Sequence, residues 1–343
     1  MKVALVGSGR IAQRHAAVLA SGSVNGVKLA GVCDTTVSKA QALGLKYAAP
    51  AFVDADQMIE EVEPDVISIL TESGNHSKNV RDLVWHRKHF VVEKPLALTV
   101  SDAQAMVTAC EDANVKVFVV KQNRFNKATV ALKSVLDTGS LGDPFLATAR
   151  VRWTRRQDYY DLAPWRGTVA LDGGVLANQA SHHLDMLLWL MGPVSSVVAD
   201  QSRVLANIES HDLALGILKF ENGARGLIEA TTATRPSDLE GSVSVLGSRG
   251  SVVVGGFSMN RIDTWNVPGV ENPAESAAET PPDVYGYGHS EFYRSVRDSL
   301  SGHPTESVGA QAGLRVVELL EALEISAKSG KEVVLRDDRR VTR

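Results

Sequence analysis

Two short stretches of the chain hold polar residues that can carry out acid–base chemistry. Lys94 stands between Glu93 and Pro95, directly after an apolar run. Because proline keeps its predecessor out of helical geometry, we expect Lys94 at a strand end, where its ammonium group can donate to an oxygen that gains charge. The second stretch holds Asn178 and His182. A neutral imidazole is a suitable general base near pH 7, so His182 or its neighbour His183 is a candidate proton acceptor.

Each stretch taken alone also fits a structure without chemistry. Lys94 fits equally well a surface lysine that follows a strand, and a histidine inside a helical pattern is more often a satisfied interior residue. Residues 173–190 form one such helical pattern, in which Asn178 and His182 are four apart and share a face. We therefore expect Asn178 to bind a substrate hydroxyl beside the base.

A glycine-rich turn near the N-terminus is typical of dinucleotide binding. Gly7, Gly9 and Ala12 give the pattern G-x-G-x-x-A between an apolar run and an amphipathic stretch. The glycines permit a tight turn and the close approach of a pyrophosphate, and the first helical amides, at Arg10 and Ile11, face the phosphates. A strand–helix turn that binds nothing is the alternative.

Asp34 follows the second apolar run, where such folds carry a ribose-binding carboxylate. A carboxylate there accepts hydrogen bonds from the adenosine ribose and repels a 2′-phosphate. Thr35 and Thr36 follow without an arginine, which favours NAD over NADP. Asn75 fits helix capping as well as cofactor binding. The other predicted cofactor contacts, at later strand ends, are Thr71, Asn75, His76, Glu93 and Lys94.

Arginine and aromatic residues alternate in the middle of the chain. Arginine forks bind carboxylates and phosphates, and aromatic rings cover sugar or base faces. The group comprises Arg124, Arg152, Trp153, Arg155, Arg156, Tyr159, Tyr160, Trp165 and Arg166. The predicted substrate-binding residues are Asn123, Arg124, Arg155, Tyr160, Trp165, Arg166 and Asn178. Solvated arginines on a strand are the alternative.

The elements that must position these residues change character near residue 124. Before it, apolar runs alternate with amphipathic stretches, which predicts a Rossmann-type parallel sheet with helices on both faces. After it, strand-like runs separated by turn signals predict an open, mostly antiparallel sheet. We therefore predict an α/β protein with an NAD-binding domain at 1–123 and an α+β substrate domain at 124–343. The predicted helix at 311–328 is a candidate to pack back on the first domain. The predicted strands are 3–6, 29–33, 66–70, 90–92, 117–120, 145–153, 196–202, 213–220, 224–232, 242–246 and 251–254.

Composition excludes some classes of function. The 343 residues are 44% hydrophobic and 22% charged, with a net charge of -4, which indicates an ordinary globular chain without a basic surface for nucleic acid or anionic lipid. No apolar run approaches the ~20 residues that a membrane span needs. Cys33 and Cys110 stand in apolar segments, which predicts reduced thiols and a cytoplasmic location. We expect no metal site.

Together these motifs resemble the glucose–fructose oxidoreductase/inositol dehydrogenase (Gfo/Idh/MocA) family. The glycine turn at 7–12, the segment 93–95 and the run 173–185 occur in the family's order along essentially the whole chain. The resemblance implies an NAD-dependent oxidoreductase acting on a CH–OH group of a sugar, and a homodimer or homotetramer. It also favours His182 over His183 as the base, because the family's histidine lies four residues after a polar one.

Many family members have aspartate where this chain has Asn178, so a charged Asp–His pair is absent here. A narrower resemblance, carried by residues 120–126, 151–160 and 165–174, is to a branch that also has asparagine there. That branch oxidises C3 of a UDP-linked N-acetyl-glucosaminuronate-type sugar in surface-polysaccharide synthesis. It implies that His182 removes the C3 hydroxyl proton while Lys94 stabilises the oxygen. A dehydrogenase of free polyols such as inositol, or a non-catalytic sensor of NAD and sugar, are the alternatives.

Overall fold

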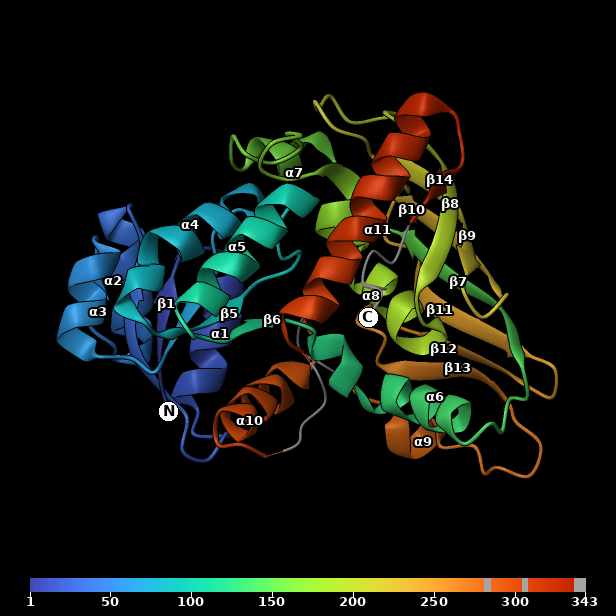
Figure 1. The fold of residues 1–343 in the computed structure, drawn as a ribbon, viewed down its shortest axis with the longest axis horizontal. Helices are drawn as coiled ribbons and strands as arrows, with labels where there is room; N and C mark the ends of the chain where they lie inside the picture. The colour runs from blue at the N-terminus through green and yellow to red at the C-terminus, as the bar shows by residue number, and fades with distance from the viewer. Residues whose placement is uncertain (281–284, 304–307, 336–343) are drawn as a thin grey trace, which may run out of the picture. The chain divides into compact units, whose positions relative to one another are not determined.

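A computed structural model describes residues 1–280, 285–303 and 308–335. The chain forms two compact units, Met1–Phe125 with Tyr287–Leu314, and Asn126–Gly286 with Arg315–Arg343 (Figure 1). Within the described residues, the first unit has a six-stranded parallel sheet and the second an eight-stranded, mostly antiparallel one. The predicted α/β class, with a parallel sheet first and an open antiparallel sheet second, is confirmed.

The sheet of the first unit has the strand order β3-β2-β1-β4-β5-β6. All four residues of the sequence VISI in β4 are buried, as a parallel sheet covered on both faces requires. The order turns back between β1 and β4, so the glycine turn after β1 lies at the crevice where open α/β sheets bind ligands. The strands are β1 (Lys2–Val6), β2 (Lys28–Cys33), β3 (Ala51–Phe52), β4 (Val66–Ile69), β5 (His89–Val92) and β6 (Val117–Val119).

Helices and short 3-10 turns connect these strands. Two of the helices start at a side-chain cap, in which Asp54 accepts from the amide of Gln57 at 2.8 Å and Thr99 accepts from that of Asp102 at 3.1 Å. The helices are α1 (Arg10–Ala20), α2 (Val37–Tyr47), α3 (Ala55–Val62), α4 (His76–Leu83), α5 (Val100–Asp112) and α10 (Gly288–Leu300), and the 3-10 turns are η1 (Ser73–Asn75), η2 (Val84–His86) and η3 (Gln122–Phe125).

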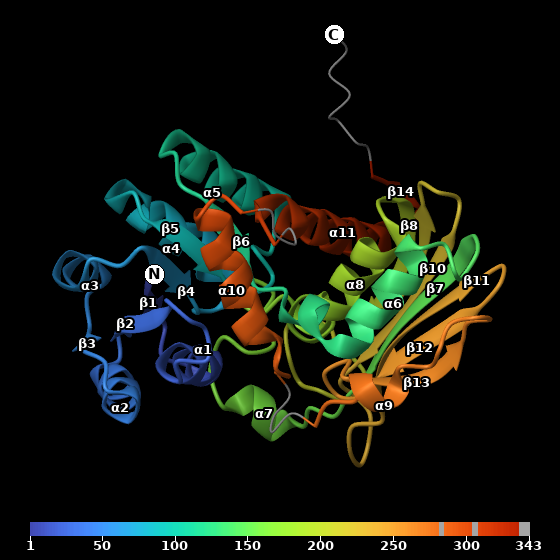
Figure 2. The same ribbon diagram turned by 90° about the horizontal axis from the view of Figure 1, so that it is seen from below.

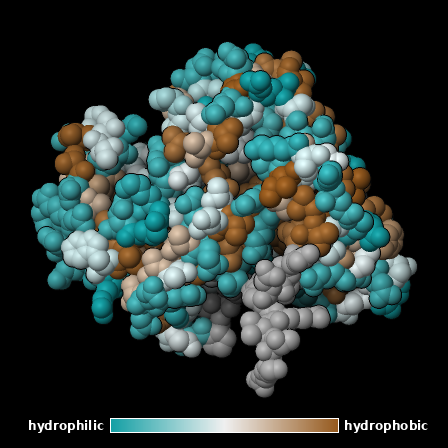
Figure 3. Space-filling model, turned by 45° about the horizontal axis from the view of Figure 1, so that its top comes forward, coloured by the Kyte–Doolittle hydropathy of each residue, from teal (hydrophilic) through white to brown (hydrophobic). Residues whose placement is uncertain are grey.

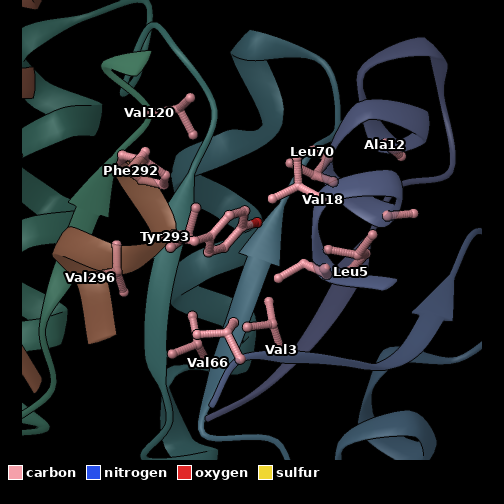
Figure 4. Packing of buried hydrophobic residues seen from close by; sticks show 14 of the residues in the cluster. Val3, Leu5, Ala12, Val18, Val66, Leu70, Val120, Phe292, Tyr293 and Val296 are labelled. Atoms are coloured by element: carbon pink, nitrogen blue, oxygen red, sulfur yellow. The ribbon is translucent and has the colours of Figure 1, made fainter. Parts of the chain in front are cut away.

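Helix α10 completes the core of the first unit although it comes late in the chain. Its Phe292, Tyr293 and Val296 have no exposed surface and share one cluster with Val66 and Val120 (Figure 4). The sequence-based boundary at residue 123 places this segment in the second domain, and the structure corrects that division. The first residues of α11 (Ala310–Ser329), up to Leu314, also belong to the first unit.

The sheet of the second unit has the order β13-β12-β11-β7-β10-β9-β8-β14. In β9 every second residue is buried, because only one face of the sheet is covered. Helices α6 and α8 lie over that covered face (Figure 2). The strands are β7 (Pro144–Arg152), β8 (Val194–Ser202), β9 (Leu213–Phe220), β10 (Arg225–Thr231), β11 (Glu240–Gly247), β12 (Ser251–Gly255), β13 (Arg261–Asn266) and β14 (Val333–Val334), and the helices are α6 (Lys127–Asp137), α7 (Gln157–Asp161), α8 (Ser181–Met191) and α9 (Ala274–Ala277).

The single helix predicted for residues 173–190 is wrong. Gly173 and Gly174 adopt φ angles of 75° and 76°, which end any helical run there. A π-helical turn, η4 (Val175–Gln179), follows, and the amide of Ala180 closes it on the carbonyl of Val175 at 2.9 Å. Helix α8 starts only at Ser181. Asn178 and His182 therefore belong to different elements, and the four-residue spacing does not place them on one helical face.

Across the described residues, no helix is long and apolar enough to cross a membrane. On the surface that Figure 3 presents, hydrophobic side chains form separate patches among hydrophilic ones. Cys33 and Cys110 are both buried and free. Burial raises the pKa of the Cys33 thiol to about 11 and that of Cys110 to about 12, so both stay protonated at neutral pH.

Candidate cofactor and substrate sites

The glycine turn leaves room for a phosphate above the N-terminus of α1. Gly7 has φ +98°, and a Cβ there would lie 2.8 Å from the carbonyl oxygen of Leu70, so only glycine fits. A Cβ at Gly9 would meet no atom within 4 Å. The first turn of α1 has no acidic residue and no side-chain cap, so its amides at Arg10 and Ile11 remain available to an anion. These residues fit the pyrophosphate of NAD.

The Asp34 carboxylate is held beside this turn by two backbone amides. Oδ2 accepts from Ser8 N and Oδ1 from Thr36 N, each at 2.8 Å. Because each carboxylate oxygen has a second lone pair, the fixed group can still accept from ribose hydroxyls.

Cofactor choice should follow Asp34. We expect the enzyme to prefer NAD, and Asp34→Ser combined with Thr35→Arg to shift the preference toward NADP, because the exchange removes a repelling carboxylate and adds a phosphate-binding fork. Dissociation constants for both dinucleotides, with Thr35→Arg alone as the control, measure the effect. Equal affinities of the parent enzyme for NAD and NADP would refute this role of Asp34.

His76 holds two loops together. Its ring has no exposed surface, with Nδ1 2.8 Å from the Pro95 carbonyl oxygen and Nε2 3.1 Å from that of Thr71. Burial lowers the pKa of His76, against the raising effect of the two carbonyls. His76 therefore ties the end of β4 to the Lys94–Pro95 segment, and its cofactor contact stays a prediction.

Thr71 and Asn75 lie beyond the carboxyl end of β4 and are partly exposed. Thr71 Oγ1 accepts from Asn79 Nδ2 at 2.7 Å. Asn75 occupies the N-cap position of α4, but its side chain donates to Glu72 Oε2 at 3.2 Å and caps no amide. Both residues stay predicted cofactor contacts.

Glu93 belongs to a buried hydrogen-bond network behind Lys94. Glu93 Oε1 lies 2.9 Å from His15 Nε2, and His15 Nδ1 lies 2.6 Å from the Tyr293 hydroxyl, which is 3.4 Å from that of Ser68. Glu93 Oε2 accepts from the Lys94 amide at 3.0 Å. Burial by itself would raise the pKa of Glu93, but the hydrogen bond and charge of His15 outweigh it and hold the pKa at about 2. An ionised Glu93 can only accept, so His15 Nε2 is the donor of this hydrogen bond.

His289 adds a third potential metal ligand to this network. Ligand atoms of His15, Glu93 and His289, all buried, lie within 4.8 Å of one another. His15 and Glu93 are already at hydrogen-bond distance, and the His289 ring meets His15 edge-on with centroids 5.1 Å apart. We interpret the cluster as a hydrogen-bonded support for the Lys94 turn. Glu93 is only 6% exposed and accepts bonds at both oxygens, which fits this supporting role, and its cofactor contact stays a prediction.

Acid should destabilise the enzyme through these buried groups. The pKa of His76 is lowered, so its stabilising contribution is complete above its ordinary value of 6.5 and declines below it. The contribution of Glu93 is complete above its ordinary pKa of 4.5 and is lost as the pH falls toward about 2. The free energy of unfolding, measured with urea from pH 8 to 3, should decline in both ranges. In Glu93→Gln the decline below pH 4.5 should be smaller. A variant with the parental slope there would contradict the assignment.

The guanidinium of Arg166 stacks on two aromatic rings in the second unit. It lies over the ring of Tyr159 at 4.2 Å and over that of Trp165 at 4.7 Å. Among the described residues no carboxylate lies within 4 Å of it. Stacking on two rings keeps the charged plane in place without neutralising it.

Arg155 stacks in the same group but has an acidic partner. Its guanidinium lies 5.4 Å from the rings of both Trp153 and Tyr159, and Nη1 lies 3.4 Å from Asp238 Oδ1. Tyr159 thus contacts both arginines, which the sequence-based choice of Tyr160 overlooked.

Asn178 is joined to this group through its neighbour. Gln179 Nε2 donates to the Tyr159 hydroxyl at 3.1 Å and to Asn178 Oδ1 at 3.3 Å, and Asn178 Nδ2 donates to Asp172. Neither Gln179 nor Asp172 stands out by residue type, and only their nearness in sequence to Asn178 was available as a signal.

The two histidines of α8 differ in exposure. His183 is 2% exposed and meets the Trp153 ring edge-on with centroids 5.8 Å apart, whereas His182 is half-buried. This difference supports His182 as the residue that can reach a substrate.

Three further predicted residues have structural partners. Tyr160 is 8% exposed, and its hydroxyl lies 2.8 Å from Thr232 Oγ1. Burial raises the pKa of Tyr160 to about 12, so its hydroxyl stays protonated near neutral pH, and its substrate contact stays a prediction. Asn123 and Arg124 lie in η3 of the first unit, 5% and 7% exposed, and their substrate contacts stay a prediction.

Arg152 does not belong to the substrate group. Its Nε and Nη2 atoms donate to the two carboxylate oxygens of Glu229 at 2.6 and 2.7 Å, and Nη1 donates to Glu240 at 3.1 Å. Glu229 and Glu240 stand on the strands that flank β7, opposite Arg150 and Arg152. Arg152 therefore stabilises a cross-strand ion-pair ladder.

Comparisons with known proteins agree with this geometry. Residues 1–121 match the family model described as the oxidoreductase family, NAD-binding Rossmann fold, and residues 133–335 match that for its C-terminal alpha/beta domain. The chain belongs to the Gfo/Idh/MocA oxidoreductase family. It is accordingly an NAD-dependent oxidoreductase that acts on the CH–OH group of a sugar or polyol.

Three relatives illustrate the range of this family. The WlbA dehydrogenase from Bordetella pertussis, solved in complex with NADH and UDP-GlcNAcA, is 36% identical, with 98% of both chains covered and a TM-score of 0.93. The D-apiose dehydrogenase of Rhizobium rhizogenes is 25% identical over 97% of both chains. The myo-inositol 2-dehydrogenase of Thermotoga maritima is 27% identical over 74% of both.

Proposed function

We propose that this enzyme uses NAD to oxidise the C3 hydroxyl of a UDP-linked N-acetyl-glucosaminuronate-type sugar, in surface-polysaccharide synthesis. Arg166 carries the proposal, because its guanidinium stacks on Tyr159 and Trp165 with no carboxylate of the described residues within 4 Å, and such a group suits a phosphate or a sugar acid. The likeness to a dehydrogenase solved with NADH and UDP-GlcNAcA supports the same class of substrate.

In the proposed reaction, His182 takes the proton from the C3 hydroxyl as general base. Lys94 donates to the same oxygen and stabilises the negative charge that develops on it. Asn178 binds a neighbouring hydroxyl and orients the ring, while Arg166 and Arg155 bind the remote charged groups and so position C3. NAD, when bound, supplies the hydride acceptor.

A substrate panel tests this proposal. NADH formation should be measured with UDP-GlcNAcA, UDP-N-acetylglucosamine, myo-inositol and D-apiose. We expect the highest kcat/KM for UDP-GlcNAcA and a lower value for the same nucleotide sugar without the carboxylate. The relatives that act on D-apiose and myo-inositol favour a free sugar or polyol as the second candidate. A higher kcat/KM for either of these than for both nucleotide sugars would decide for that candidate, and no turnover of any sugar would favour a sensor.

Arg166→Ala should weaken use of the charged substrate. Loss of a charge-assisted contact costs roughly 2–4 kcal/mol, so kcat/KM for UDP-GlcNAcA should fall by about 30- to 1000-fold, with NAD affinity unchanged. Arg156→Ala is the matched control, because Arg156 is exposed and donates only a 3.3 Å bond to the Pro236 carbonyl. Equal kcat/KM values for parent and Arg166→Ala would remove the basis of the substrate assignment.

The open face of the second sheet supports a proposed homo-oligomer. Val198, Leu215, Ile217 and Leu227 are 42, 45, 52 and 41% exposed, and Ile217 pairs with both Val198 and Leu227 across the strands. Such a contiguous apolar patch fits a second copy of the same face. Light scattering should give a dimer or tetramer, and a monomer at micromolar concentration would oppose it. Two free, buried cysteines also suit the proposed reducing cytoplasm.

A further inference from the structure

A buried carboxylate joins the two halves of the candidate substrate site. Asp172 is 2% exposed. Its Oδ2 accepts from the amide of Gly167 at 3.1 Å, and its Oδ1 accepts from Asn178 Nδ2. Gly167 follows Arg166 directly, so one carboxylate bonds both the loop of the stacked arginine and the π-helical turn that carries Asn178.

The arginine loop is seated tightly at this point. Gly167 has φ +71°, and a Cβ there would lie 2.5 Å from Ile208 Cγ2 and 3.2 Å from Tyr160 Cδ1. Ile208 packs with Tyr160 and Ala206 in a small buried cluster beneath the loop. The loop backbone therefore has little freedom to move away from Asp172.

The partners of Asn178 define which way round its amide lies. Because Asp172 accepts from Nδ2, Oδ1 is left to accept, and Gln179 donates to it at 3.3 Å. An ionised carboxylate has no proton to donate, so it cannot bond Oδ1 and the reversed amide is excluded. The hydrogen bond between residues 172 and 178 therefore needs one carboxylate and one amide.

We propose that Asp172 is a positioning residue that fixes the Asn178 amide and the backbone after Arg166 relative to each other, and so sets the spacing at which a charged sugar is bound. The inference rests on the proposed function for its substrate. The charges of Asp172 and Asp212 both raise the pKa of Tyr160, and the His211 ring packs against Gly174. The other titratable or charged groups near Asp172 and Asn178 are therefore Tyr159, Tyr160, Arg166, His211 and Asp212.

Four variants separate positioning from a general structural effect. Asp172→Asn leaves two amides in contact, Asn178→Asp leaves two carboxylates, and the double variant restores one of each with the hydrogen bond reversed. Glu209→Gln is the matched control, because exposed Glu209 accepts from the Val169 amide of the same loop at 2.9 Å. All four are assayed for kcat, KM and NAD affinity on the best substrate of the panel.

Asp172→Asn should lower kcat/KM by about ten- to a hundredfold, the equivalent of one hydrogen bond to a charged group, with NAD affinity unchanged. The double variant should recover at least tenfold over the weaker single variant, and Glu209→Gln should stay within twofold of the parent. Parental kinetics in Asp172→Asn, or a double variant no better than the single ones, would overturn the inference. These ratios of kcat/KM between variant and parent are expected for whichever substrate is best. If the best substrate is a polyol, the proposed function is refuted, but the positioning role of Asp172 is not.

A stability measurement tests the contact without any substrate. Two carboxylates in contact share one proton, so Asn178→Asp should lose stability relative to the parent as the pH rises from 5 to 8. The double variant should lose this pH dependence. A constant difference between Asn178→Asp and the parent over this range would overturn the paired arrangement, and the expected slope would support it even where no turnover is found.

Discussion

His182→Ala is expected to lower kcat by about 10²–10⁴-fold, the usual contribution of a general base, while folding and NAD affinity stay unchanged. The reason is that His182, half-buried on the first turn of α8, is the more exposed of the two histidines there. The pH profile of kcat/KM should rise through an ionisation in the ordinary range of imidazole groups, about 6–7.5, and this rise should vanish in the variant.

The neighbouring histidine provides the control for this result. His183 packs against Trp153, so His183→Phe keeps an aromatic ring in that contact and should change kcat by no more than a few fold. If His183→Phe lost turnover and His182→Ala kept it, the assignment of the base on α8 would be reversed.

Lys94→Ala is expected to lower kcat by a similar factor, about 10²–10⁴-fold, because the oxygen that loses its proton would lose a charged donor. NAD should still bind, since the glycine turn and Asp34 are untouched. Stopped-flow NADH formation at saturating substrate measures the effect. Lys78→Ala, which removes an exposed lysine paired with Asp82 on α4, is the control and should stay within twofold of the parent.

Partial recovery in Lys94→Arg would show that a cation at this position is what the reaction needs. Turnover of Lys94→Ala within threefold of the parent would exclude Lys94 from the chemistry and leave the buried network of Glu93 and His15 without a catalytic purpose.

The fold could be predicted where local sequence determines it. Continuous apolar runs mark the buried parallel strands. Alternation of buried and exposed residues marks β9, in a sheet that is covered on one face only. Strand β3 has two residues, too few for any period to show. Helix α10 is amphipathic, but nothing local says that Phe292 and Tyr293 return to the first unit, because that depends on packing with residues far earlier in the chain, such as Val66 and Val120.

The residues of the candidate site also differ in how far the sequence alone could predict them. Arg166, Asn178 and His182 could be chosen by residue type and motif, since their chemistry is local to the side chain. Arg152 could not be judged, because its partners Glu229 and Glu240 come from other strands of the sheet.

The sequence could not show which groups hold the side chains of Glu93 and His76, for a related reason. Both follow buried strands at the ligand-binding edge, but each side chain turns inward to partners on other elements, His15 for Glu93 and the Pro95 carbonyl for His76. The direction of a side chain at a strand end is set by tertiary packing, which the sequence does not display.

Isotope transfer from C3 tests the central claim most directly. UDP-GlcNAcA labelled with deuterium at C3 should be incubated with enzyme and NAD, and the nicotinamide product and the sugar analysed by mass spectrometry. The account predicts NADH that is one mass unit heavier and a sugar nucleotide that has lost the deuterium as its C3 hydroxyl becomes a ketone. Unlabelled NADH together with a sugar that keeps its deuterium would place the oxidation at another carbon and contradict the account.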